Sequence, residues 1–310
     1  MEKILRQISD EEIILEKFLR GQMGLTKRQI SQAKFRHDGI RVNGVQSRVN
    51  SRIYTGDFVE VKLEEYMASS NVLPYGGELS VLYEDDDLLA VDKPAGLVVH
   101  PAHGHYSDSL ANQVAYYCEK KKESMPIRCV GRLDKETSGI VVFARNQVSA
   151  GRLSMQREQG DYIKEYLAIT EGIPAETEGT ISMGMRKAEG SLNRMEVSEE
   201  GKPAVTHYQV LESGDGKSLL RLRLETGRTH QIRVHMAWMG CPLLGDRIYG
   251  NKESHNRYID RAALHAWKVS FYHPFTHERI SLEAPLPEDM RTEIKVSSKW
   301  LRAVCKRVLR

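Results

Sequence analysis

The feature that most restricts the fold is a series of short apolar segments that begins at residue 79. Such strand-like runs recur at LSVLY, LLAVD, GLVVH, GIVVFA, EYLAIT, THYQVLE, LLRLRLE, LHAWKVSFY and RISLEA. Helical patterns interrupt them only at SLANQVAYYCEK, QVSAGRLSMQRE and THQIRVHMAWMG. Because strands and helices do not alternate, a doubly wound parallel sheet is excluded. We expect an α+β domain built on a large, mixed but mostly antiparallel sheet.

A smaller unit precedes this sheet domain, since 310 residues exceed one average domain. Thr26 is placed to cap a helix, and strand-like residues follow around the Asn43-Gly44 turn and after the Gly56-Asp57 turn. The next residues lose periodicity and collect Ser, Asn, Pro and Gly. We therefore expect a small α+β module over 1–65, a linker over 66–78, the sheet domain over 79–286 and a basic helical tail over 287–310.

Positive charge is concentrated in two segments, although the net charge is only +3. Residues 13–62 contain ten Lys and Arg against four Asp and Glu, and residues 287–310 contain seven against three. A bias of this size usually marks a solvated face. The first segment, however, reads FL…GLTKRQ…IRVNG…GDFVEV and resembles the S-four-type RNA-binding domain. That resemblance implies phosphate contacts from five side chains: Lys27, Arg28, Lys34, Arg36 and Arg41.

Other classes of site are not indicated. No apolar run reaches 18 residues and the N-terminal residues mix charged with apolar side chains, so we expect a cytoplasmic protein without a membrane segment. The four cysteines show no C-x-x-C spacing, which argues against a disulfide framework or a zinc site. Three histidines in one loop, His100, His103 and His105, do not reproduce a usual ligand set. We expect no metal.

The reactive group that we expect lies in the sequence GRLDKETSGIVVFA. Asp134 stands in a polar loop whose exit is fixed by a wholly apolar strand, and such loops on rigid scaffolds often present functional groups. An Asp that merely caps a turn would look the same. The full string resembles the R-L-D-x-x-T-S-G signature of the RluA/RluD-type pseudouridine synthases. Further segments in the family's order extend the resemblance over about residues 80–285: AVDKPAGLVVHP, KEYLAI, GKPAVTHY, TGRTHQIRVHM, LLGDRIYG and LHA.

The resemblance implies the pseudouridine synthase fold and a reaction that isomerises uridine in RNA to its carbon-linked form. It makes Asp134 the catalytic carboxylate and Tyr166 the aromatic residue that stacks on the target base. Arg228, in GRTHQIR, is the residue that we expect to pair with Asp134 and keep it ionised. One departure is Gly131, where many members of the family have His, and this removes a possible contact to the flanking nucleotide.

Three more side chains are expected to bind the substrate. Arg132 is a candidate to fill the space that the target uridine leaves when it is extruded from a folded helix. Alternatively, Arg132 forms only a salt bridge to a nearby carboxylate. Leu244 and Leu264 are candidates for apolar walls of the pocket, although core positions are the usual fate of Leu.

The reaction needs no coenzyme, and the chain has no dinucleotide fingerprint, Walker loop or H-E-x-x-H motif. Asp134 could act as a nucleophile toward sugar or base, or as a base toward a ribose proton. The expected partner is large-subunit ribosomal RNA, because an N-terminal S-four-type module in this family favours that substrate over transfer RNA. The expected oligomeric state is a monomer. The alternatives are a transfer RNA synthase, a catalytically silent RNA-binding assembly factor, and a hydrolase that pairs Asp134 with Glu136.

Overall fold

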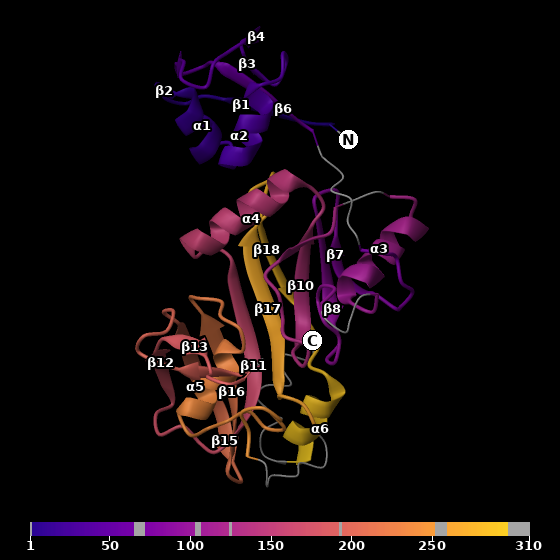
Figure 1. Ribbon diagram of the computed structural model, residues 1–310, viewed down its shortest axis with the longest axis vertical. Helices are drawn as coiled ribbons and strands as arrows, with labels where there is room; N and C mark the ends of the chain where they lie inside the picture. The colour runs from indigo at the N-terminus through magenta and orange to yellow at the C-terminus, as the bar shows by residue number, and fades with distance from the viewer. Residues whose placement is uncertain are drawn as a thin grey trace.

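A computed structural model describes residues 2–64, 72–102, 107–123, 126–191, 194–251 and 259–296. The chain forms a small N-terminal unit, seen at the top of Figure 1, and a larger unit built on one long sheet. The expected α+β class with a large mixed sheet is confirmed. Among the described residues no helix is long and apolar enough to cross a membrane.

The N-terminal unit has its own sheet and core. Its sheet has the order β1 (Glu2–Ile8), β6 (Phe58–Glu64), β3 (Ile40–Val42) and β4 (Val45–Gln46). Two helices, α1 (Leu15–Gly21) and α2 (Lys27–Lys34), and a short pair, β2 (Ile13–Ile14) with β5 (Arg52–Ile53), complete it. The expected cap is confirmed, because Thr26 Oγ1 accepts from the N–H of Gln29. Strand β1 was not anticipated.

The large unit is a ten-stranded sheet. Its main path runs through β12 (Glu178–Ser182), β15 (Val205–Gly214), β16 (Lys217–Leu224), β11 (Ile163–Glu171), β17 (Leu264–Tyr272), β10 (Ser138–Ala144), β8 (Leu88–Lys93) and β7 (Ser80–Glu84). β18 (Arg279–Glu283) pairs with β17, and β9 (Arg128–Val130) pairs with β10. A separate hairpin joins β13 (Met185–Lys187) to β14 (Met195–Val197). Only β10 and β17 are paired in parallel among these described strands.

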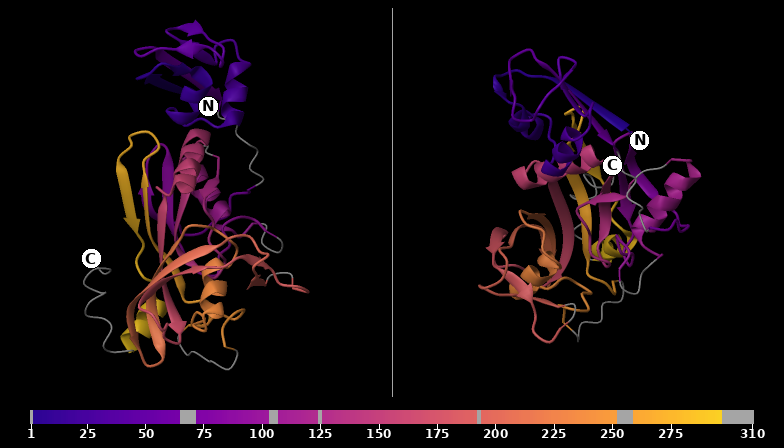
Figure 2. Two further views of the ribbon diagram at one scale, coloured as in Figure 1. Left: turned by 90° about the vertical axis from the view of Figure 1, so that its left-hand side faces the viewer. Right: turned by 45° about the horizontal axis from the view of Figure 1, so that its top comes forward.

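Four helices complete the large unit: α3 (Leu110–Lys120), α4 (Gln147–Gln159), α5 (Gln231–Trp238) and α6 (Glu288–Val296). Helix α4 lies between the N-terminal unit and the sheet, and α5 lies beside β13 and β16 (Figures 1 and 2). The three expected helices of the sheet domain are confirmed, as is the start of the tail helix. The rest of the tail, residues 297–310, lies outside the described part of the chain.

One expected strand is wrong. The segment GLVVH, residues 96–100, has no strand conformation. Its carbonyl groups instead serve the first turn of α3, because Leu110 N donates to Val98 O at 2.8 Å and Ala111 N donates to Val99 O at 3.0 Å. Backbone groups that bond to a helix start cannot join a sheet ladder.

Side chains of β11 alternate between two cores on opposite faces of the sheet. Tyr166 and Ala168 belong to the core that also contains Leu133 and Leu264. Leu167 and Ile169 belong to the core that also contains Met290 of α6, together with Leu244 and Leu219. Since successive residues of a strand point to opposite faces, a residue that packs with Leu167 is on the other face from Tyr166.

The two units are joined by specific contacts at α4. The guanidinium group of Arg152 donates to Met23 O from Nε at 3.0 Å and from Nη2 at 2.6 Å, and Nη1 donates to Pro274 O at 2.5 Å. Val148, also on α4, packs in the core of the N-terminal unit. Lys3 of β1 pairs with Asp87. These contacts fix the N-terminal unit over one end of the large sheet.

Candidate active site

The loop that carries Asp134 connects β9 to β10 and is held by hydrogen bonds from both sides. A turn is closed within it by Thr137 N, which donates to Asp134 O at 3.1 Å. The carbonyl of Lys135 accepts from Gly96 N at 2.8 Å and from Lys93 Nζ at 3.2 Å. The carbonyl of Glu136 accepts from Arg261 Nη1 at 3.1 Å. A backbone tied at consecutive positions keeps Asp134 in one place.

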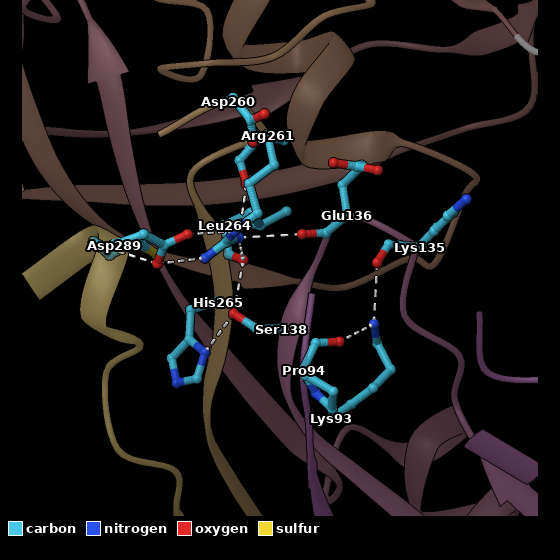
Figure 3. Close-up of polar contacts among 12 residues, drawn as sticks. Lys93, Pro94, Lys135, Glu136, Ser138, Asp260, Arg261, Leu264, His265 and Asp289 are labelled. Atoms are coloured by element: carbon cyan, nitrogen blue, oxygen red, sulfur yellow. Dashed lines mark hydrogen bonds and ion pairs between the residues drawn. The ribbon is translucent and has the colours of Figure 1, made fainter. Parts of the chain in front are cut away.

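Lys93 is the most unusual of these supports because its side chain is fully buried. Its Nζ donates to three carbonyls: to Pro94 O at 2.9 Å and Lys135 O at 3.2 Å, both drawn in Figure 3, and to Leu97 O at 2.7 Å. Burial, helped by the charge of Arg261, lowers its pKa to about 7 against the opposing charge of Asp134. Three acceptors match the three donors of an ammonium group.

Arg261 ties the same loop to α6. Its Nε and Nη2 donate to Asp289 at 2.7 and 3.0 Å, and its Nη1 also donates to Ala262 O and Leu264 O (Figure 3). Only 7% of Arg261 is exposed. The start of β10 is equally restricted, since a Cβ added to Gly139, at φ +109°, would lie 2.3 Å from Ala266 O. The Thr-Ser-Gly sequence therefore lets β10 approach β17 closely.

Asp134 itself is half-buried, and its carboxylate has no hydrogen-bond or ion-pair partner among the residues that the structure describes. Its charge nevertheless acts on several neighbours. Burial lowers the pKa of Lys93 and His230, and the charge of Asp134 opposes this lowering. Burial raises the pKa of Tyr166 and Tyr249, and the charge of Asp134 adds to this effect. Burial lowers the pKa of Arg233, whereas the charges of Asp246 and Asp134 raise it. An uncommitted carboxylate in such surroundings is available to a substrate.

Tyr166 is on β11, close enough to the Asp134 loop for the charge of Asp134 to act on its hydroxyl. Its ring is 8% exposed and shares a core with Leu133 and Leu264. Burial, and secondly the charge of Asp134, raises its pKa above the ordinary value. Its hydroxyl makes no hydrogen bond to another described residue. The ring can therefore form an apolar wall and still present a free, neutral hydroxyl next to the carboxylate.

Replacing Tyr166 with Phe separates these two properties. If the ring alone is needed, the Phe variant keeps the wild-type kcat, and if the hydroxyl moves a proton, kcat falls by about 10²-fold or more. We expect the second result, because a hydroxyl without a protein partner is free for the substrate. Single-turnover rates on the same RNA give the measurement, and a Leu variant, which loses stacking as well, is the matched control.

The expected ion pair between Arg228 and Asp134 is not formed. Arg228 is exposed, and its Nε donates to Pro203 O at 3.1 Å. The reason is its position on the loop before α5, whereas the second arginine of the motif, Arg233, lies within the helix and is 2% exposed. The Arg233 guanidinium is also the one whose pKa the Asp134 charge helps to raise, although burial acts against it and Asp246 contributes more.

Arg233 is held by a two-point ion pair. Its Nε and Nη2 each donate to Asp246 at 2.7 Å, and both side chains are almost completely buried. Asp246 Oδ1 also accepts from the N–H groups of Ile248 and Tyr249. Burial would raise the pKa of Asp246, but these hydrogen bonds and the Arg233 charge together lower it. The Arg233 guanidinium also stacks on the Tyr249 ring, 5.2 Å from its centroid.

The other residues that were expected to contact the substrate do not all lie near Tyr166. Leu264 packs with Tyr166, which is compatible with a pocket wall. Leu244 packs with Leu167 and Ile169 on the opposite face of β11, so it fills the core under α6 and is not placed beside Tyr166. Arg132 is exposed in the loop just before Asp134. Of the three loop histidines, His100 is half-buried near Arg132, while His103 and His105 lie outside the described residues.

One group of described residues has the donor set of a metal site: Asp85, Asp87 and His273. Its atoms are already used within the protein. His273 Nδ1 accepts from the N–H groups of Phe275 and Thr276, and Nε2 contacts Asp85 at 3.1 Å. This cluster lies at the contact with the N-terminal unit, where Lys3 pairs with Asp87. We therefore read it as part of that contact.

Sequence reasoning missed Lys93, Arg261 and Arg233. Lys93 ends the apolar run LLAVDK, where a cation is out of place, and that was the available signal. Arg233 shares one motif with Arg228, and only the start of α5 between them decides which guanidinium is buried. For Arg261 no local signal exists, since its partner Asp289 is far along the chain.

Comparisons with known proteins agree on one family. A family model described as RNA pseudouridylate synthase matches residues 87–238. An RNA pseudouridine synthase named YhcT from Bacillus subtilis is 42% identical over 82% of this chain and 84% of its own. Ribosomal large subunit pseudouridine synthase D of Haemophilus ducreyi is 36% identical over 82% of this chain and 81% of its own. A solved structure, human RNA pseudouridylate synthase domain containing 4, is 26% identical, with a TM-score of 0.57 over 70% of this chain and 92% of that chain.

Proposed function

Since the chain belongs to the RNA pseudouridylate synthase family and is an RNA pseudouridine synthase, we propose that it isomerises uridine in large-subunit ribosomal RNA with Asp134 as the catalytic carboxylate. The single observation that carries the role of Asp134 is the contrast within its loop. Neighbouring carbonyls accept hydrogen bonds from Lys93 and Arg261, whereas the carboxylate makes no hydrogen bond or ion pair with another described residue. The loop is fixed and its reactive group is free.

The reaction conserves all atoms of the nucleotide except one exchanged proton. The bond from the base nitrogen to the ribose breaks, the base turns, and carbon 5 of the same base bonds to the sugar while its proton leaves. Either role open to Asp134, nucleophile or base, requires a carboxylate that is accessible and aimed at the nucleotide. Tyr166 would hold the face of the base and relay the carbon 5 proton to water, because its neutral hydroxyl can accept that proton only as it gives up its own. Leu264 would restrict the access of water to the other side of the base.

The buried Arg233 takes the place that we expected Arg228 to fill. Its guanidinium does not bond directly to Asp134, but its charge acts on that carboxylate and is held in position by Asp246 and Tyr249. A fixed positive charge in a site shielded from water stabilises a carboxylate more strongly than an exposed one. We assign Arg228, which is exposed and bonds to Pro203 O, to the edge of the proposed site.

The target nucleotide must leave a folded RNA before Asp134 can reach it, at a cost of a few kcal/mol. Arg132 is exposed two residues before Asp134 and is our candidate to occupy the vacated stack. Ribosomal RNA as the target is favoured by the relatives named for the large subunit, which extend over four fifths of this chain. It is favoured as well by the basic N-terminal unit.

The test of this function is direct. The purified chain is incubated with transcripts of large-subunit ribosomal RNA and of transfer RNA, and pseudouridine is mapped by carbodiimide adducts. We expect new adducts in the ribosomal transcript. Adducts only in transfer RNA would mean that transfer RNA is the substrate. Adducts in neither transcript, with RNA binding retained, would favour a catalytically silent assembly factor.

The N-terminal unit is proposed as an S-four-type RNA-binding domain. Lys27, Arg28 and Lys34 are exposed on α2, and Arg36 and Arg41 are half-buried nearby in the chain. The cation on Lys34 lies 4.9 Å from the ring centroid of Phe35, which is 81% exposed. Cations beside an exposed aromatic ring suit a nucleic acid better than they suit a plain solvated face.

Neutralising two of these cations gives a testable effect. In a Lys27→Gln, Arg28→Gln variant we expect KM for RNA to rise and the slope of log KM against log salt to fall by about 1.4 to 1.8, with kcat unchanged. The melting temperature should not move, because both side chains are exposed. The matched control is Arg6→Gln, Arg52→Gln in the same unit, whose cations already pair with Glu60 and Glu12. Equal salt slopes in the two variants would contradict this role for α2.

A further inference from the structure

Arg157, near the end of α4, stands between the two loops that carry the active-site motifs. One neighbour is Gly131, which precedes Arg132 and Asp134, and the other is Gly227, which precedes Arg228. A Cβ added to Gly131 would lie 3.7 Å from Arg157 Cζ, and a Cβ added to Gly227 would lie 3.6 Å from its Nη2. Because neither glycine has a side chain, neither loop covers the guanidinium at these points.

No protein group in the described part of the chain uses this guanidinium. Arg157 is exposed and makes no hydrogen bond, ion pair or ring contact with another described residue. Arginines of the same chain that have structural roles look different: Arg152, one and a half turns earlier on α4, makes three hydrogen bonds to carbonyl groups. Five donors held over two open loops and left unused within the protein suit a ligand with several acceptors.

The surroundings of Arg157 are positive. Its charge reaches the Tyr166 hydroxyl and contributes, after burial, to lowering the pKa of Lys164 to about 8. The charges of Lys164, Arg157 and Arg132 all act on the same thiol, Cys129, whose own pKa burial raises to about 11. Three cations therefore lie close enough to act on one thiol, and the charge of one of them, Arg157, also reaches Tyr166, so this region favours an anion.

We propose that Arg157 binds a phosphate of the RNA next to the target uridine. The inference rests on the proposed function, because it takes RNA as the ligand, and it adds a named anchor for the backbone at the cleft. Gly131 has φ +82°, a conformation that favours glycine, and the absence of a side chain there leaves the guanidinium uncovered toward a ligand. A phosphate contact fixes the register of the RNA without reading its sequence.

Such a contact should place the extruded uridine relative to Asp134. Arg157 is then a binding residue, since it touches the substrate away from the bonds that change. Its loss should raise KM and leave the chemical step of bound RNA nearly intact. Arg157→Gln removes the charge, and Arg157→Lys keeps the charge but loses the planar set of donors.

The experiment compares wild type, Arg157→Gln and Arg157→Lys on a transcript of large-subunit ribosomal RNA. We expect KM for the Gln variant to rise about tenfold, with kcat changed less than about threefold and the salt slope reduced by about 0.7 to 0.9. The Lys variant should keep the wild-type salt slope. Random ethylation of phosphates, which removes their charge, should identify one phosphate beside the target uridine that wild type needs and the Gln variant does not.

Controls separate this contact from general charge and from folding. Lys120→Gln removes a cation from α3, on the other flank of the sheet, and should leave KM unchanged (Figure 1). Melting temperatures should coincide, because Arg157 supports no other described side chain. A Gln variant with the KM, salt slope and ethylation pattern of wild type would overturn the inference while the proposed function stands. No pseudouridine in the wild-type reaction would overturn both.

Discussion

Replacing Asp134 with Asn should lower the rate of pseudouridine formation by at least about 10³-fold. The carboxamide has nearly the same shape but can act neither as a nucleophile nor as a base. The variant should fold as wild type does, because the Asp134 carboxylate supports no other described side chain and the turn around it is held by backbone groups. Its melting temperature should stay within about 1 °C and its affinity for RNA should be unchanged.

An Asp134→Glu variant is the control for geometry. It keeps the charge but moves the carboxylate by one methylene, and a displacement of that size can cost about 10²-fold in rate. Single-turnover rates on one RNA rank the three proteins. If Asn retains more activity than Glu, the reaction does not depend on a carboxylate at this position, and the assignment of Asp134 is wrong.

The second large effect concerns stability. Arg233→Met should reduce the free energy of unfolding by about 3 to 5 kcal/mol, because it leaves the Asp246 carboxylate buried with only two backbone N–H partners. For a domain of this size that loss corresponds to a melting temperature lower by roughly 10 °C. Calorimetry of the full chain gives the measurement.

A double variant, Arg233→Met with Asp246→Leu, tells whether the buried charge is the cause. Removing both charges should restore much of the lost stability. Activity should remain low in the double variant, since Asp134 would still lack the positive charge nearby. If the double variant were as unstable as Arg233→Met alone, packing of the arginine stem and not the unpaired carboxylate would account for the loss.

Much of the fold could be predicted from the sequence because local signals agreed with the tertiary structure. The run GIVVFA forms β10, which is buried on both faces, and Thr26 caps α2 as its position suggested. The failures occurred where tertiary partners decided the outcome. Residues 96–100 are apolar enough for a strand, but their carbonyls are used by the first turn of α3. Strand β1 mixes charged and apolar residues and depends on pairing with β6.

In the candidate site, too, the predictions failed where tertiary contacts decided the position of a side chain. Asp134 and Tyr166 were predicted from motifs, and in the structure the charge of Asp134 acts on the Tyr166 hydroxyl. The pairing of Arg228 with Asp134 was expected, yet the helix start between Arg228 and Arg233 buries the second arginine instead. Leu244 was expected to line the pocket, but it packs against Leu167 and Ile169, on the face of β11 opposite to Tyr166. A sequence motif does not tell which face of a neighbouring strand a residue will pack against.

Lys93 and Arg261 show what a motif cannot give. Their side chains donate hydrogen bonds to the Lys135 and Glu136 carbonyls. Every residue type has a backbone carbonyl, so the sequence does not indicate which carbonyls will accept such bonds. Arg261 also ties this loop to Asp289 of α6 (Figure 3). The rigidity of the Asp134 loop is therefore a property of the tertiary structure, although Asp134 itself can be proposed as the reactive residue from the sequence.

We propose that one carboxylate, on a loop fixed from both sides, carries out the isomerisation. The most direct test is pseudouridine mapping of ribosomal RNA from cells that lack this protein and express either the wild type or the Asp134→Asn variant at equal levels. We predict that wild type restores one or more pseudouridines in large-subunit RNA and that the variant restores none. Restoration by Asp134→Asn at the wild-type level would show that the reaction does not need the Asp134 carboxylate.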